Sequence, residues 1–188
     1  MKKIMILAAI AVCASVMLTG CKSKKVSSEV GATEIVLPLS GKDYTSNKDF
    51  FRTTQLGKSP DLSTAKKIAL QNAKTELAAN IQSTIKAVTD NYTNQISVAD
   101  KQEFENKFEE LQRAVVNQEL NDVHVIGEKV FKEKDGKYTY YIAIEMSKEI
   151  IERKTSDRIS NDAKLKLDFD KFQYQKIFDE EMKKFENQ

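Results

Sequence analysis

The feature of this sequence that most constrains its fold is an apolar residue at every fourth position across residues 65–85. The members of this ridge are Ala65, Ala69, Ala73, Leu77, Ile81 and Ile85. Because residues four apart lie on one face of an α-helix, the spacing predicts a long helix with a narrow apolar ridge. The three alanines leave room for the close approach of another backbone. We therefore expect this helix to lie against a sheet or a second helix.

Local signals define the expected ends of this helix. Ser59 suits the N-cap, Pro60 suits the first helical position, and Asp61 adds negative charge to the first turn. We expect the helix to end near Asn91.

A second helix is predicted from residue 97 to about residue 120. Ser97 and Asp100 have the spacing of a weak capping box at its start. Apolar residues with helical spacing then form a stripe that we expect to be buried, made of Phe104, Phe108, Leu111 and Val115.

The dipeptide Asp135-Gly136 is the strongest short turn signal in the chain and predicts a β-hairpin. Residues 121–134 and 137–146 flank it as strands, and the second alternates between apolar and polar residues as a half-buried strand does. Gly127 interrupts the first strand and is expected to mark a β-bulge. Two shorter apolar runs, residues 34–39 and 50–54, are further candidates for strands.

Ser147 is expected to cap a last helix that begins at Lys148 and continues to the carboxyl end. The sequence does not decide whether this helix is continuous or is broken around residues 155–162. A row of phenylalanines is typical of a buried helix face, and a partner-binding helix is the alternative. The apolar side consists of Phe169, Phe172, Phe178, Met182 and Phe185.

These elements predict an α+β fold: a small antiparallel sheet with a β-hairpin, packed by long helices, in the chain order β-(β)-α-α-β-β-α. A chain of 188 residues favours one folded domain. We assign residues 34–150 to the α+β domain and residues 151–188 to a C-terminal helical segment that packs on it.

The first 20 residues are expected to be a signal peptide rather than part of the fold. Lys2 and Lys3 precede an uncharged apolar run, residues 4–18, which is shorter than the roughly 20 residues of a membrane span. Leu18-Thr19-Gly20-Cys21 resembles the lipobox of bacterial lipoproteins. The resemblance implies that Cys21 becomes the first residue and carries acyl chains, such as palmitate, on its sulfur and nitrogen. The alternatives are an ordinary secretory peptide with an incidental cysteine and a tail-less membrane anchor.

Removal of this signal peptide changes the chemistry available to the chain. The full sequence has 30 basic and 28 acidic residues, and the loss of Lys2 and Lys3 leaves 28 of each. A neutral chain without a basic stripe gives no reason to expect a nucleic-acid partner. Cys13 leaves with the signal peptide and Cys21 becomes a thioether, so no thiol remains for a disulfide, a metal or a nucleophile.

Residues 21–33 are small and polar, and we interpret them as a lipidated, flexible tether. The twelve residues after Cys21 reach at most roughly 40 Å, which keeps the folded domain near its membrane. No aspartate follows Cys21 directly, and Lys22 to Lys25 lack acidic residues. By resemblance to lipoprotein sorting in other bacteria, these features favour the outer membrane, with the domain facing the periplasm.

Several residues, taken with the lipobox and the order of elements, carry a resemblance to a known family. These residues are Phe51-Arg52-Thr53, Gly57, Ala65, Ala69, Ala73, Glu76-Leu77-Ala78, Asp135-Gly136-Lys137-Tyr138, Ile144 and Lys148. The chain resembles the LPP-twenty lipoprotein family and the related amino-terminal domain of flagellar assembly protein T. The resemblance implies a compact α+β domain in an envelope lipoprotein with no established enzymatic activity. It carries over no binding residue to this chain.

The sequence offers few groups for catalysis or metal binding. His124 is the only histidine, and we expect it on the surface of a strand. The chain has no phosphate-binding loop, nucleophile elbow or HExxH motif. Three pairs of neighbouring acidic residues are Asp168 with Asp170, Glu109 with Glu110, and Glu180 with Glu181. None of them has the loop glycines or the ligand spacing of a calcium site. We therefore predict a protein that is not an enzyme and requires no cofactor or metal.

Three functions remain to be distinguished by the fold. The first is a non-enzymatic interaction or structural protein of the cell envelope with a protein partner, favoured by a closed core and an exposed apolar patch. The second is a periplasmic carrier of a small ligand or lipid, with a pocket lined by Tyr138, Tyr140, Phe131 or Phe104. The third is an enzyme, which requires a cleft with converging polar groups. We predict the first.

Overall fold

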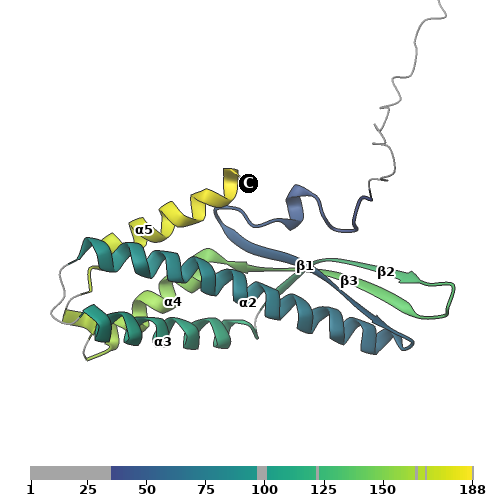
Figure 1. Ribbon diagram of the computed structural model, residues 1–188, viewed down its shortest axis with the longest axis horizontal. Helices are drawn as coiled ribbons and strands as arrows, with labels where there is room; N and C mark the ends of the chain where they lie inside the picture. The colour runs from purple at the N-terminus through teal and green to yellow at the C-terminus, as the bar shows by residue number, and fades with distance from the viewer. Residues whose placement is uncertain (1–34, 97–100, 122, 164, 168, 188) are drawn as a thin grey trace, which may run out of the picture. The chain divides into compact units, whose positions relative to one another are not determined.

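The computed structural model describes residues 35–96, 101–121, 123–163, 165–167 and 169–187. Over these residues the fold is α+β, as predicted, with a three-stranded antiparallel sheet and four α-helices (Figure 1). Residues 36–188 form one compact unit. The strands are β1 (Phe50–Ser59), β2 (His124–Lys132) and β3 (Tyr138–Ser147), and the helices are α2 (Leu62–Gln95), α3 (Lys101–Glu119), α4 (Lys148–Asn161) and α5 (Lys171–Lys183).

The sheet has the strand order β1-β3-β2, so the hairpin partner β3 is the central strand. The predicted turn is confirmed: Gly136 has a φ of 85°, which favours glycine, and its N–H donates to the carbonyl of Glu133 at 3.0 Å. The predicted bulge is confirmed as well, because the pairing of β2 with β3 shifts between Val125 and Gly127. Both β1 and β2 are therefore edge strands.

Helix α2 lies along β1 and β3 with its apolar ridge toward the sheet (Figure 1). The first five ridge residues, from Ala65 to Ile81, are completely buried, and Ile85 is 4% exposed. Gly57 in β1 makes the closest approach, since a Cβ atom there would lie 2.3 Å from the carbonyl oxygen of Ala65. The small residues in both elements thus let the helix backbone and the strand touch, as the ridge predicted.

Helix α2 begins and ends later than expected. Its N-cap is Asp61, whose side chain accepts a hydrogen bond from the N–H of Thr64 at 2.7 Å, while Ser59 ends β1. Pro60 therefore lies before the N-cap rather than in the helix. The helix continues past Asn91 to Gln95, because Tyr92 and Thr93 are buried on it.

Of the two candidate strands near the amino terminus, the run at residues 50–54 forms the first half of β1. The run at residues 34–39 is described from Ile35 onward, and these residues form no strand. Pro38 has no N–H for a sheet hydrogen bond, and Leu39 has a φ of 57°, outside the extended region. The segment is followed by a short 3₁₀ helix, η1 (Lys42–Tyr44). The predicted capping box at Ser97 and Asp100 lies outside the described residues.

The last helical region consists of two helices, α4 and α5, separated near the break left open by the sequence. Ser147 is the N-cap of α4 but makes no capping hydrogen bond through its side chain. The N–H of Lys148 donates instead to the carbonyl of Asp49, just before β1, at 3.0 Å. Phe172 was expected on the buried face of α5, but it is 78% exposed.

An aromatic cluster joins α2, α3 and α5. Figure 1 shows that the carboxyl-terminal part of α2 lies together with α3 and α5 at the end of the fold away from the hairpin. Its ring centroids lie 5.4–6.3 Å apart, within the range of favourable aromatic contacts. The members are Tyr92, Phe104, Phe108, Phe169, Tyr174 and Phe178.

No helix in the described part of the chain combines the length and apolar character required to cross a membrane.

Candidate functional site

The predicted lipid-attachment residue, Cys21, lies outside the described residues. His124 lies at the start of β2 and is exposed, as expected for a histidine on the sheet surface. It borders a shallow pocket of about 580 Å³ together with Arg153 and Lys154 of α4. Lys154 is already paired with the buried carboxylate of Glu119 at 2.6 Å. The pocket therefore brings together no acid and base pair suited to catalysis.

The predicted acidic pairs have structural partners. Asp170 is the N-cap of α5 and accepts a hydrogen bond from the N–H of Gln173, whereas Asp168 lies outside the described residues. Glu181 is buried and accepts hydrogen bonds from Asn91 and Lys184. Among the described residues, no group of three or more acidic, histidine or cysteine side chains is positioned to hold a metal ion.

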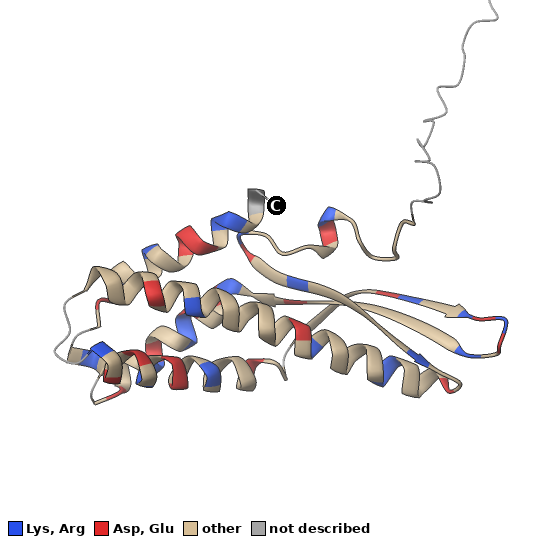
Figure 2. Ribbon diagram, in the orientation of Figure 1, with Lys and Arg blue, Asp and Glu red and all other residues tan. Residues whose placement is uncertain are grey.

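Glu109 and Glu110 on α3 face two different lysines. Glu109 lies 3.9 Å from Lys86 of α2, and Glu110 lies 3.4 Å from Lys107 of α3. Figure 2 shows basic and acidic residues interspersed along α3 and α5. These charges form mixed, solvated helix faces rather than a patch of one sign.

The four aromatic residues suggested for a carrier pocket are not brought together. Tyr140 lies on the helix-facing side of β3, whereas Phe131 contacts Tyr141 on the opposite face, with ring centroids 5.8 Å apart. Phe104 belongs to the aromatic cluster, and Tyr138 lies beneath the ammonium group of Lys132. The structure therefore does not assemble the pocket expected from these residues.

An ion pair closes the helix-facing side of the sheet next to Tyr140. Lys66 of α2 lies 2.7 Å from Glu128 of β2, and its ammonium group lies 5.6 Å from the ring centre of Tyr140. The hydrogen bond to Lys66 lowers the pKa of Glu128, and the same bond raises the pKa of Lys66. Burial raises the pKa of the Tyr140 hydroxyl. These groups hold their ordinary charges at neutral pH and connect the helix to the sheet.

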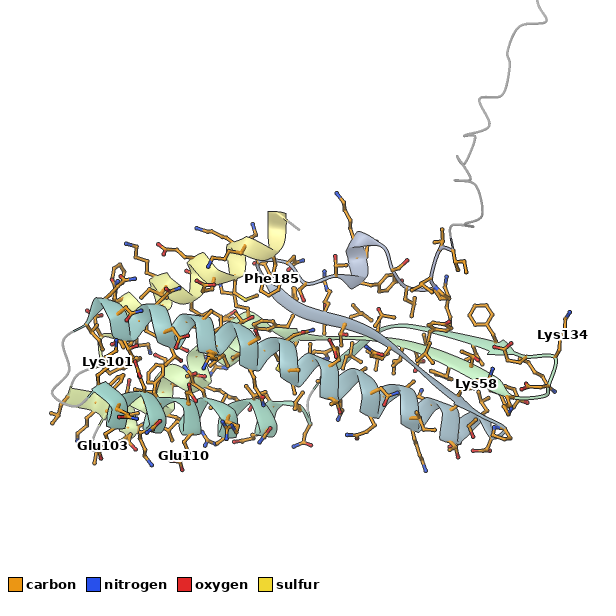
Figure 3. The ribbon with its side chains drawn as sticks, viewed as in Figure 1. Lys58, Lys101, Glu103, Glu110, Lys134 and Phe185 are labelled. Atoms are coloured by element: carbon orange, nitrogen blue, oxygen red, sulfur yellow. The ribbon has the colours of Figure 1, made fainter. Side chains whose placement is uncertain are left out.

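A groove of about 1300 Å³ lies along the free edge of β1. One wall comes from the amino-terminal segment, including Leu37, Leu39 and Tyr44, and the other includes Asn80 of α2 and Phe185. Residues 53–56 of β1 lie between these walls. Figure 3 shows Phe185 beside the first residues of β1, where its ring meets that of Phe51 at 6.2 Å. We call this opening the β1 groove.

Side chains satisfy parts of the free edge of β1. The Ser46 hydroxyl accepts a hydrogen bond from the N–H of Arg52 at 2.9 Å and donates to its carbonyl at 3.2 Å. Asn47 bonds both backbone groups of Phe50. Farther along, the side-chain amide of Asn72 donates to the carbonyl of Leu56 at 2.9 Å. The edge is thus covered at both ends, and the β1 groove lies between them.

The amino-terminal wall is held on the outer face of the sheet by specific contacts. The hydroxyl of Thr54 donates to the carbonyl of Leu39 at 2.9 Å, and Leu39 is 6% exposed despite its positive φ. Gly127 leaves room for this wall, because a Cβ atom there would lie 2.8 Å from the ring of Tyr44 and 3.1 Å from Leu39. The glycine beside the bulge in β2 therefore allows the segment to cross the sheet.

The β1 groove has a mixed apolar and polar lining with a small positive charge. Leu37 is 58% exposed and Leu56 is 42% exposed. Lys42 and Arg52 are the charged residues among its described lining. Arg52 is paired with Glu145 of β3 at 2.8 Å, so its charge is already compensated. Lys42 forms no ion pair with any described residue and remains available to a ligand.

Sequence reasoning did not identify this groove. Its apolar residues come from segments far apart in the chain, and the edge of β1 becomes visible only when the strand order is known. The run at residues 34–39, which ends in Pro38 and Leu39, is the one signal in the sequence, and its composition makes it only a candidate for a strand.

Comparison with known proteins finds no matching family model, no matching curated protein and no matching solved structure. The resemblance to the LPP-twenty family stays a prediction.

Proposed function

We propose that this protein is a lipid-anchored component of the bacterial cell envelope that binds another envelope protein through the β1 groove and has no enzymatic activity. The anchor is Cys21, in the lipobox Leu18-Thr19-Gly20-Cys21. Acyl chains at about 0.8 kcal/mol per buried methylene would make this attachment effectively permanent. We place the domain on the periplasmic side of the outer membrane.

The observation that carries the proposal is an open, partly apolar groove on a domain whose helix and sheet interface is filled. Leu37 and Leu56 expose apolar side chains at the groove, while the residues between α2 and the sheet are buried. An exposed apolar surface rimmed by polar groups is typical of a protein contact. A carrier would instead enclose most of its ligand.

A photo-crosslinking experiment in intact cells tests this function. A photoreactive benzophenone amino acid replaces Leu56 in the groove or, in a control, Phe172 on α5, which is 78% exposed. We expect a discrete protein adduct from position 56 and none from position 172. Equal adducts from both positions, or none from position 56, would contradict binding through the groove.

A further inference from the structure

We propose that the β1 groove binds an extended segment of the partner protein, which adds to the sheet by backbone pairing at Thr54 and places a carboxylate beside Lys42. This inference rests on the proposed function and specifies the chemistry of the partner. Strand addition of this kind obtains its affinity from main-chain hydrogen bonds and its specificity from neighbouring side chains.

In an antiparallel strand, the N–H and carbonyl groups of successive residues point alternately toward one neighbouring strand and away from it. This alternation places the backbone groups of Thr54 on the free edge of β1. Residues of β1 pair without interruption with β3, and Thr54 lies opposite Ala143. Phe50, Arg52 and Leu56 have the same parity as Thr54, and their backbone groups bond Asn47, Ser46 and Asn72, outside the ladder. The N–H and carbonyl of Thr54 therefore point the same way, away from β3.

These groups lie in a gap between the side-chain caps. Among the described residues, no hydrogen bond outside the sheet engages the N–H or carbonyl of Thr54 or the N–H of Leu56. The gap from Arg52 to Leu56 spans roughly 13 Å at about 3.3 Å per residue. That length accommodates a short extended segment and lies inside the β1 groove.

The other edge strand, β2, is protected in a different way. It carries the bulge at Gly127 and the charged residues Glu128, Lys129 and Lys132. Bulges and charged side chains are the usual protection of an edge strand against pairing. The contrast identifies β1 as the edge that is open to a partner strand.

The occupant is a segment of another protein rather than a second copy of β1. In an antiparallel pair centred on Thr54, Arg52 of one copy would lie opposite Leu56 of the other. The caps at these positions, Ser46 and Asn72, project from the same edge and would meet between the strands. A segment without caps avoids this obstruction.

The charge of the groove selects among such segments. Lys42 is uncompensated within the described structure, and no acidic residue lines the groove there. A segment with a carboxylate is therefore favoured over one with a lysine or arginine. The exposed side chains of Leu37 and Leu56 suit apolar neighbours of that carboxylate.

A pair of variants at Thr54 tests the pairing. Thr54→Val and Thr54→Pro both lose the hydroxyl that bonds Leu39, but only proline removes the outward N–H. Proline is tolerated where the N–H of an edge strand faces away from the sheet. Each variant is made in the full-length chain with the photoreactive residue at position 56, and thermal melts of the purified proteins check the fold.

We expect the protein adduct to persist in Thr54→Val and to fall about tenfold in Thr54→Pro, as the loss of one or two backbone hydrogen bonds predicts. Equal adducts in both variants would overturn strand addition and leave the proposed function standing. The absence of any adduct even with Thr54 intact would overturn both. An adduct to lipid or to a second copy of the chain would overturn the stated occupant.

A second measurement does not depend on the stability of the proline variant. The probe is the acetylated, amidated peptide Thr-Val-Glu-Val-Thr, added to the purified lipoprotein in detergent. We expect amide hydrogen exchange at Thr54 and Leu56 to slow about tenfold or more when the peptide is bound, because paired amides are protected. Unchanged exchange at both amides with about 1 mM peptide would overturn the proposal.

The charge preference has its own control. Replacing the peptide glutamate by glutamine, or making Lys42→Gln in the protein, is expected to weaken binding of the probe about threefold, the usual effect of one exposed charge pair. The glutamine peptide and the Lys42→Gln protein together should show no further loss, because either change alone already removes the pair. Unchanged affinity in both single changes would overturn the role of Lys42.

Discussion

Gly57 is the residue at which the strand and the long helix make their closest contact. A Cβ atom there would lie 2.3 Å from the carbonyl oxygen of Ala65 and 2.4 Å from the backbone nitrogen of Ala69. Both neighbours are backbone atoms, so no side-chain rotation relieves the clash. The position therefore requires glycine for space.

We expect Gly57→Ala to destabilise the domain by about 3 kcal/mol or more, at the upper end of the cost of overpacking. Chemical denaturation measures the free energy of unfolding. Gly41→Ala is the matched control, because a Cβ atom at Gly41 has no atom within 4 Å. Equal stability of the two variants would show that β1 and α2 are not in backbone contact.

Glu152 on α4 is a buried carboxylate that costs stability at neutral pH. Burial raises its pKa above the ordinary value of 4.5, and the negative charge of Asp179 adds to this effect, whereas Lys148 opposes it. Between pH 4.5 and the raised pKa, the folded state keeps a proton that the unfolded chain has lost. The free energy of unfolding therefore decreases as the pH rises through this interval.

We expect Glu152→Gln to raise the melting temperature at pH 7 and to have no electrostatic effect below about pH 4, where the carboxyl is protonated in both states. Thermal melts across this range provide the measurement, with Glu180→Gln on the exposed face of α5 as the control. A stabilisation that is the same at pH 4 and pH 7 would exclude the proposed linkage.

At the scale of elements, the alanine ridge of α2 determines how the fold is assembled. Ala65, Ala69 and Ala73 are completely buried against the sheet, while Ala79 lies on the exposed face of the same helix. Buried and exposed alanines thus occur on the same helix. The same substitution at each kind of position therefore separates the effect of packing on stability from the effect of helix propensity.

We expect Ala69→Leu to cost roughly 1–3 kcal/mol, because the added volume enters a filled interface. Ala79→Leu should change the stability by less than about 0.5 kcal/mol, as is usual for surface positions. Denaturant titration of both variants gives the comparison. If the two variants unfold at the same denaturant concentration, the ridge does not lie at the interface.

The sequence predicted the elements that depend on local periodicity. The ridge, the hairpin at Asp135-Gly136 and the bulge at Gly127 follow from spacing and turn chemistry, and the structure has all three. Helix ends were less accurate, because Asp61 rather than Ser59 provides the cap. A choice between two adjacent capping residues depends on where the preceding strand ends.

The candidate site depends on tertiary contacts, so the sequence predicted little of it. The segment around Leu39, which forms one wall of the β1 groove, resembles a strand in its composition but crosses the sheet instead. Gly127 leaves space for it there, and the hydroxyl of Thr54 donates a hydrogen bond to it. Phe172 resembled a core residue by its type and is exposed, because Tyr174, Ile177 and Phe178 occupy the buried face of α5.

At the scale of the whole molecule, one buried hydrophobic core holds the described part of the chain together. The cluster of buried residues extends from Phe51 to Met182 and joins all the major elements except β2. We expect an excess of chelator to leave the melting temperature unchanged, because a structural metal would supply folding free energy and its removal would lower it. A decrease in calorimetry would require a metal site.

The central claim of membrane anchoring depends on one residue. A cysteine with acyl chains on its sulfur and its amino group would hold the domain, and with it the β1 groove, at the surface of the membrane. Cys21→Ser should leave either a soluble protein or an uncleaved precursor. The proposed anchor, Cys21, precedes residues 36–188, which form one compact unit.

Intact mass spectrometry of the mature protein, extracted from membranes of cells that express the full sequence, tests this claim most directly. We predict a chain that begins at Cys21 and whose mass exceeds that of residues 21–188 by a glyceride and its acyl chains. A mass equal to that of the unmodified chain, or a chain that retains residues 1–20, would contradict the account.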